Sequence, residues 1–311
     1  MIAEVQAQRG LRNEAGLILK EALDAAHASQ TPPERWPSCP RVRHLAASAE
    51  LYVETLSDVA KAQAKTGLIE DAAATLDAAL QFIPAIKDSS LWKADVSRSL
   101  ALSKIAEAQS EAGLRAQSAA TFERAEQAAS EVREARWHIM ALTRLARAQY
   151  KAGRVTDATR AFDEALEFAR ALENNAQRPS GFLDVLEAKI ELGLAVTDAT
   201  LVQAVEAARS IADKSRRAFP LSRIAQVQEK AERLQDAVIT YGEALEAVDA
   251  NNNKWGRINS LFLVMRGLPT RPPEARLIAE SAPQVVRIAQ SIEDELRRSE
   301  AFVVIARALP N

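Results

Sequence analysis

Histidine and cysteine are the side chains best suited to bind a transition metal or to act as a nucleophile, and this chain has few of them. Its histidines are His27, His44 and His138, and its single cysteine is Cys39. None of them has the spacing of an HExxH zinc motif or of a paired-cysteine site. No predicted helix terminus or fixed histidine is placed to activate the Cys39 thiol. The sequence therefore predicts neither a metal site nor a cysteine nucleophile.

Phosphate and nucleotide chemistry relies on glycine-rich loops, and only 10 of the 311 residues are glycine. Neither a phosphate-binding loop, a dinucleotide fingerprint nor a GxSxG element occurs in the sequence. Adjacent carboxylates such as Glu70 with Asp71, or Glu293 with Asp294, lie near predicted helix ends, where the helix dipole favours acidic side chains. We therefore expect a protein that is not an enzyme and that uses no cofactor.

The overall composition is that of a folded protein without a strong charge field. Apolar residues make up 48% of the chain, and 40 basic against 42 acidic side chains give a net charge of −2. Such a balance attracts neither nucleic acid nor an anionic membrane as a whole. No apolar run approaches the ~20 residues that span a bilayer, and the start "MIAEVQAQRG" lacks the features of a signal peptide. With one cysteine, we expect a cytoplasmic protein without a membrane or nucleic-acid partner.

An internal repeat organises the chain. The segments "LSDVAKAQAKTG" at 56–67, "LSKIAEAQSEAG" at 102–113 and "LTRLARAQYKAG" at 142–153 are versions of one phrase. Lining them up gives a column of large apolar residues with steps of 46, 40, 40, 39, 40 and 41. The column contains Leu56, Leu102, Leu142, Phe182, Leu221, Leu261 and Phe302. A period near 40 residues predicts stacked copies of one structural unit.

The pattern of each copy predicts two helices. Apolar residues at i, i+3 and i+4, as in Leu142, Leu145 and Ala146, give the stripe of a first helix, which we call helix A. A glycine such as Gly153 then ends helix A, and a second apolar stripe forms helix B, antiparallel to helix A. Near residue 232 a glutamate, Glu232, takes the place of the glycine. The sequence predicts an all-α fold, an α-solenoid (superhelix) of about seven antiparallel helical hairpins plus a terminal helix, as one array over residues 1–311.

The order large, large, small, turn glycine, small, aromatic, small resembles a tetratricopeptide repeat. The copy that matches best reads Leu142, Leu145, Ala146, Gly153, Ala158, Phe162 and Ala165. The resemblance covers nearly the whole chain but is loose, because the family has a period of 34 residues and a closing proline that is missing here. The tyrosine of the family's first helix is replaced by glutamine in the copies with Gln63, Gln109, Gln149 and Gln228.

HEAT repeats are the second family that the chain resembles, since their period is ~40 residues or more and they carry an aspartate shortly before an arginine. Here an Asp or Asn stands four residues before an Arg in several copies, as in Asp213 with Arg217, and Glu134 with His138 keeps the form more weakly. One interpretation is that the acid caps helix A and pairs with the Arg one turn later. The other is that the arginines form a row that reaches a partner's carboxylates or phosphates.

Two segments interrupt the repeat. Residues 30–40 contain "TPPERWPSCP", and this proline density predicts a stiff loop between two hairpins. The final stretch "AFVVIARALPN" reads as a helix A without a helix B after it. Its apolar face leads us to expect a possible homo-oligomer through the terminal helix 295–309.

Tetratricopeptide geometry, if it holds, implies that the A helices line a concave surface whose polar positions face a ligand. Charges of both signs at these positions favour a protein or peptide partner over a polyanion. We expect a noncatalytic protein–protein interaction scaffold; the alternatives are an oligomerising structural or regulatory arm of a larger protein and a helical-repeat nucleic-acid binder. The expected partner-binding residues are Lys61, Lys104, Glu107, Arg144, Arg147, Tyr150, Asp184, Glu187, Arg223, Gln226 and Arg266.

Overall fold

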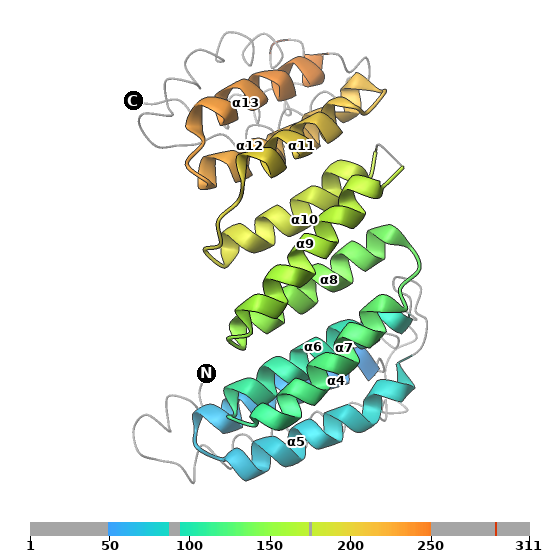
Figure 1. Cartoon of the computed structure of the whole chain (residues 1–311), viewed down its shortest axis with the longest axis vertical. Coiled ribbons are helices and arrows are strands. Elements are labelled where there is room, and N and C mark those ends of the chain that lie inside the picture. Colours follow the sequence, from blue (N-terminus) through green and yellow to red (C-terminus); the bar gives the residue numbers. More distant parts are fainter. Residues whose placement is uncertain (1–48, 87–93, 174–175, 250–289, 291–311) are drawn as a thin grey trace. The chain divides into compact units, whose positions relative to one another are not determined.

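The computed structural model describes residues 49–86, 94–173, 176–249 and residue 290. Every regular element in these ranges is helical, with ten α-helices and two short 3₁₀ helices (Figure 1). The all-α helical-repeat fold predicted from the sequence is confirmed for this part of the chain. The expected loop at 30–40, Arg266 and the terminal helix 295–309 lie outside the described residues.

The described helices form five A–B pairs, with a short turn inside each pair. The first three pairs are α4 (Ala49–Lys65) with α5 (Ile69–Phe82), α6 (Ala94–Glu111) with α7 (Arg115–Ser130), and α8 (Ala135–Lys151) with α9 (Val155–Ala171). The last two are α10 (Arg178–Glu191) with α11 (Asp198–Arg209), and α12 (Ala218–Lys230) with α13 (Leu234–Asp249). The 3₁₀ helices η1 (Ile83–Ala85) and η2 (Lys214–Arg216) lie in connections between pairs.

The packing divides the chain into two compact units, Met1–Ala165 and Leu166–Asn311, with the boundary inside α9. In the first unit α4 packs on α5 and α6, and α6 packs on α7 and α8. In the second unit α10 packs on α11 and α12, and α12 packs on α13. Each A helix therefore has a B helix on one side and another A helix on a second side.

The repeated apolar columns form the core of each unit. The large residue that opens each phrase is at most 5% exposed in all five described copies. The small residue four positions later, Ala60 in the first of these copies, is fully buried, and so are helix B aromatics such as Phe122 and Phe162. Burial of this size is the main source of stability for a helix pair that is too short to be stable alone. The core thus follows the sequence period.

The turn between helices A and B uses one geometry throughout. After α8, Gly153 has a φ of 79°, and the N–H of Arg154 donates to the carbonyl of Gln149 at 2.8 Å. This is the hydrogen bond of a Schellman motif, which needs a left-handed residue at the glycine position. After α12 the same bond runs from Arg233 to Gln228 at 2.8 Å, but the left-handed residue is Glu232, with a φ of 62°. The last described turn therefore carries backbone strain that the glycine turns avoid.

A basic side chain joins each described hairpin to the one before it. In every copy from α6 onward, it comes from the start of helix A and donates to a backbone carbonyl just beyond the previous helix B. Arg98 bonds the Ile86 carbonyl at 3.0 Å, His138 Nδ1 the Val132 carbonyl at 3.0 Å, Arg178 Nε the Leu172 carbonyl at 2.8 Å, and Arg217 Nε the Ile211 carbonyl at 2.7 Å. Each acceptor carbonyl belongs to a buried apolar residue. We call this recurring hydrogen bond between hairpins the carbonyl joint.

The carbonyl joint corrects one interpretation of the sequence. Asp213 caps the 3₁₀ helix η2 and not helix A itself, since its carboxylate accepts the N–H of Ser215 at 3.0 Å, while α12 begins only after Arg217. The expected pairing with Arg217 is wrong, because Arg217 donates to the Ile211 carbonyl instead. Glu134 makes no capping hydrogen bond with its side chain at the start of α8. The described members of the arginine row therefore stabilise the connection between hairpins.

Replacing Glu232 by glycine should stabilise the protein. The substitution removes a left-handed strain of about 1–2 kcal/mol and adds about 0.4–1 kcal/mol of unfolded-state entropy, which leaves a net gain of about 0.5–1 kcal/mol. Urea unfolding monitored by circular dichroism measures the change. Gly153→Ala is the matched control and should destabilise by about 1–2 kcal/mol, because its backbone needs positive φ although no atom lies within 4 Å of the added methyl. Equal effects of the two substitutions would contradict the assignment of strain.

Replacing Arg217 by methionine should destabilise the second unit by about 1–3 kcal/mol. The apolar substitute leaves the Ile211 carbonyl without its charged donor, while an unbranched side chain replaces most of the arginine stem. The adjacent Arg216, which is exposed, provides the matched control, and Arg216→Met should stay within about 0.5 kcal/mol of wild type. Thermal and urea unfolding measure both variants. A loss of the same size in the two variants would show that the carbonyl joint contributes nothing specific.

Candidate binding grooves on the A helices

Ion pairs connect neighbouring A helices along the face that carries the expected partner-binding residues. Glu107 of α6 accepts a hydrogen bond from Lys61 of α4 at 2.6 Å and lies 3.6 Å from the ammonium of Lys151 of α8. One turn earlier, Lys104 of α6 pairs with Glu54 of α4. These contacts link three successive A helices, and three of their side chains, Lys61, Lys104 and Glu107, are expected partner-binding residues.

Glu107 is the central residue of this set. Its side chain is only 11% exposed, so the carboxylate depends on its two lysines for compensation. Burial by itself would lower the pKa of Lys61, but hydrogen bonds and the negative charges of Glu107 and Glu111 outweigh burial and raise the pKa. Lys61 is therefore held as a cation, and the pair is a fixed part of the surface.

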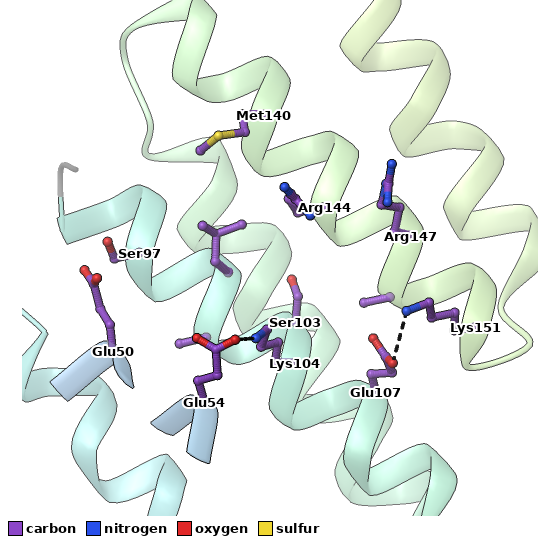
Figure 2. Close-up of a pocket in the computed structure, with 13 residues that line it drawn as sticks. Glu50, Glu54, Ser97, Ser103, Lys104, Glu107, Met140, Arg144, Arg147 and Lys151 are labelled. Carbon is purple, nitrogen blue, oxygen red and sulfur yellow. Dashed lines mark hydrogen bonds and ion pairs between the residues drawn. The ribbon is translucent and has the colours of Figure 1, made fainter. Parts of the chain in front are cut away.

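A groove with a cavity volume of about 400 Å³ lies over α4, α6 and α8 (Figure 2). This volume falls within the range of ordinary ligand pockets, roughly 300–1,000 Å³. Small and apolar residues of α6 and α8 form part of the lining, including Leu100, Ala101, Met140 and Ala148. The remaining lining residues are Glu50, Glu54, Ser97, Ser103, Lys104, Glu107, Arg144, Arg147 and Lys151. The groove thus combines an apolar strip with polar groups at its edges.

The charges of this groove are separated by sign. Figure 2 shows Glu50 and Glu54 on one side of α6, and Arg144, Arg147 and Lys151 on the other side. Glu54 and Lys151 are held in the ion pairs already described. Glu50 and Arg144 make no ion pair or hydrogen bond through their side chains with any other described residue. One carboxylate and one guanidinium are therefore available, on opposite edges of the groove.

A second, smaller groove lies between α10 and α12 in the second unit. Its cavity volume is about 170 Å³, and Glu187, Arg223 and Gln226 are among its lining residues. Glu187 and Arg223 form an ion pair across the two helices. The Arg223 guanidinium also lies 5.8 Å from the ring centre of Phe219, whose side chain is 44% exposed. The Phe219 ring, which is not part of the groove lining, thus lies beside the cation of a residue that is.

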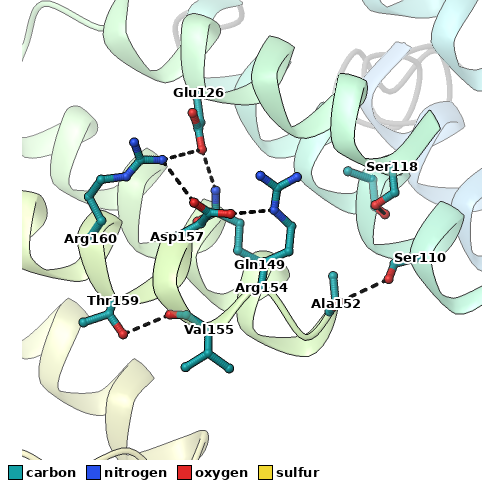
Figure 3. A network of polar contacts seen from close by, with 11 residues as sticks. Ser110, Ser118, Glu126, Gln149, Ala152, Arg154, Val155, Asp157, Thr159 and Arg160 are labelled. Atoms are coloured by element: carbon teal, nitrogen blue, oxygen red, sulfur yellow. Dashed lines mark hydrogen bonds and ion pairs between the residues drawn. The ribbon is translucent and has the colours of Figure 1, made fainter. Parts of the chain in front are cut away.

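The side of the first unit formed by its B helices carries a polar network instead (Figure 3). Glu126 of α7 accepts hydrogen bonds from Gln149 Nε2 of α8 at 2.8 Å and from Arg160 of α9 at 3.2 Å. Asp157 accepts a further bond from Arg154 Nε at 2.7 Å. These hydrogen bonds connect successive hairpins, although the buried Oε1 atom of Gln149 has no hydrogen-bond partner among the described residues. Gln149, which stands at the position of the family's tyrosine, takes part in this connection.

The structure brings most of the expected partner-binding residues onto the two grooves. Lys104, Glu107, Arg144 and Arg147 line the first groove, and Lys61 pairs with Glu107 beside it. In the second unit, Glu187, Arg223 and Gln226 line the second groove. The half-buried side chains of Tyr150 and Asp184 line neither groove. That Tyr150 and Asp184 bind a partner therefore stays a prediction.

Sequence reasoning missed several groove residues. Met140 and Lys151 lie four residues before Arg144 and four residues after Arg147, so they continue the predicted stripe by one helical turn in each direction. Glu54 lies seven residues before Lys61, which is two helical turns along the same face of α4. Extending the predicted positions by one or two turns along each helix would have found all three.

Among the described residues, no group of three or more His, Cys, Asp or Glu side chains could hold a metal ion. Within the same ranges, none of the helices has the length and apolar character that a membrane span requires.

Comparisons with known proteins assign neither a family nor an activity to the chain. No family model matches the chain, and no curated protein matches it. Thirteen chains of solved structures match. One of them, the crystal structure of Ton1535 from Thermococcus onnurineus NA1, is 14% identical, with 97% of each chain covered and a TM-score of 0.46. A likeness this distant assigns no activity, and the resemblance to tetratricopeptide repeats stays a prediction.

Replacing Glu107 by glutamine should destabilise the first unit by about 1–3 kcal/mol, because two lysines lose the charge of a buried carboxylate. Urea unfolding measures the loss. Glu111→Gln is the matched control: Glu111 also reaches Lys61, at 3.1 Å, but its side chain is 35% exposed, and the expected cost is about 0.5 kcal/mol or less.

The difference in the free energy of unfolding between wild type and Glu107→Gln should depend on pH, because the pKa of Lys61 is raised. A lysine whose pKa is raised by folding stabilises the folded state fully below its unfolded pKa, about 10.4, and this contribution is lost as pH rises through the folded pKa. The difference between wild type and Glu107→Gln should therefore be constant from about pH 7 to about pH 10 and shrink above that range. A difference that shrinks between about pH 7 and pH 9 would contradict the assignment.

Proposed function

We propose that this protein is a noncatalytic scaffold that holds a peptide or protein segment along the face formed by its A helices. The observation that carries the proposal is the groove over α4, α6 and α8, which is built from A-helix residues and has a volume of about 400 Å³. Its apolar strip and separated charges are the features with which a surface selects a peptide chain. The proposed site of action is the cytoplasm, in keeping with a single cysteine.

The composition of the groove favours a peptide over a polyanion. A nucleic-acid strand is held by a continuous basic track with aromatic side chains that stack on bases. Here acidic residues occupy one edge, and Glu107 lies among the lysines. Several ionisable groups of the two grooves are held in ion pairs with one another, and neither lining contains a histidine or a cysteine. Binding without chemistry is therefore the function that this set of residues supports best.

Quantitative affinity purification from the native organism tests the proposal. Wild type and Arg144→Glu are used side by side as full-length baits, and recovered proteins are compared by mass spectrometry. A partner that binds the groove should be recovered about fivefold less with Arg144→Glu, because an attractive charge becomes repulsive.

Arg124→Glu is the matched control. Arg124 is exposed on α7, a B helix, so this substitution makes the same change of charge away from the groove. It should recover the same partners as wild type. A photo-crosslinking residue in place of Met140 then shows which segment of the partner contacts the groove. Equal recovery by all three baits, with no crosslink from position 140, would refute binding at this face.

A further inference from the structure

The charged residues of the groove over α4, α6 and α8 are arranged by sign, and this arrangement restricts which peptides can bind there. The charged side chains of the groove's central helix, α6, are already neutralised by ion pairs, because Lys104 pairs with Glu54 and Glu107 pairs with Lys61. The two charges that remain available belong to the outer helices, Glu50 on α4 and Arg144 on α8. An occupant therefore meets a negative group at one edge and a positive group at the other edge, with little net charge between them.

Between these edges the lining is small and apolar. Ala101 of α6 is buried at the base of the groove, while Leu100 of α6 and Met140 of α8 are half-buried beside it. Ser97 contributes a hydroxyl group to the lining, while the Ser103 hydroxyl already donates to the Ser99 carbonyl at 2.7 Å. Apolar side chains of an occupant gain most by lying over this strip.

We propose that this groove selects a dipolar peptide segment, with a basic side chain against Glu50, an apolar side chain over α6, and an acidic side chain against Arg144. The proposal rests on the proposed function and specifies the class of partner. It follows from charge complementarity, since a segment of a single sign would place a like charge against one of the two edges.

The geometry also sets the spacing of the two charges in the segment. Packed helices lie about 8–10 Å apart, so α4 and α8, on either side of α6, are separated by roughly 16–20 Å. An extended chain advances about 3.3 Å per residue, and about five or six residues therefore span the groove. The basic and acidic residues of the segment should be separated by about this number of positions, with an apolar residue between them.

A random dodecamer peptide library displayed on phage tests this inference. The library is selected on the full-length wild-type protein and counter-selected on Arg144→Glu, so that only peptides that need the groove are kept. Peptides with one basic and one acidic residue in a constant order and about five or six positions apart are expected. Their affinities are then measured by fluorescence anisotropy.

Charge-swapped variants give the decisive comparison. Glu50→Arg and Arg144→Glu alone should each weaken the selected peptides about fivefold, because each creates a like-charge contact. The double variant should instead prefer peptides in which the basic and acidic residues are exchanged. Circular dichroism and thermal unfolding of all variants check that the fold is kept.

The outcomes separate this inference from the proposed function. Selected peptides that need Arg144 but carry a single sign or no charge would overturn the dipolar segment and leave peptide binding intact. A double variant that fails to prefer the exchanged peptides would also overturn it. A selection that enriches no peptide on the wild-type protein would count against both proposals.

Discussion

The constraint on which this structure depends is that a two-helix hairpin cannot bury its apolar face by itself. Each A helix therefore packs against a B helix and against another A helix, and alanine at the contact positions lets the helices approach closely. In α6 this burial extends to most of the helix surface, from Val96 to Gln109. Little of each A helix is left to solvent. Polar side chains on that remaining strip face their counterparts on the next A helix, and this proximity determines both the ion pairs and the groove.

The same constraint explains why the charged residues of the candidate grooves both hold neighbouring A helices in place and determine which charges a partner meets. Glu107 is compensated by lysines of both neighbouring helices, and the second unit repeats the device with Glu187 and Arg223. Such pairs fix the positions of neighbouring A helices and leave only isolated charges for a partner. A surface of this kind gains specificity from the few groups that are not already compensated.

Much of the architecture could be predicted from the sequence, because a buried column must recur with the repeat. Leu142 and Phe162 identify helices A and B in the best copy, and Gly153 identifies their turn. The carbonyl joint could not be predicted in the same way. Its basic residues recur regularly, but their acceptor is a backbone carbonyl, which has no side-chain signature. Helix α11 also departs from the repeat, since it begins at Asp198, five residues after Gly193, where the Thr197 side chain caps it, whereas α9 begins two residues after Gly153.

The candidate site was predictable in position and less so in composition. Helical periodicity placed Arg144 and Arg147 on one face, and they do line one groove. The sequence could not show that Lys61 and Glu107 would compensate each other, because that pairing depends on the distance between two helices 46 residues apart in the chain. Whether a charged residue is available to a partner is decided by its neighbours in space.

The carbonyl joint has a consequence for how such a chain changes length during evolution. Because its acceptor belongs to the main chain, any hairpin can receive the basic side chain of any other hairpin, whatever their sequences. Gene duplication that inserts or removes a whole period therefore restores every joint at once, without compensating mutations in the flanking copies. Hairpins can therefore be added or removed as units, provided that each copy keeps its buried apolar columns and one basic residue at the start of helix A.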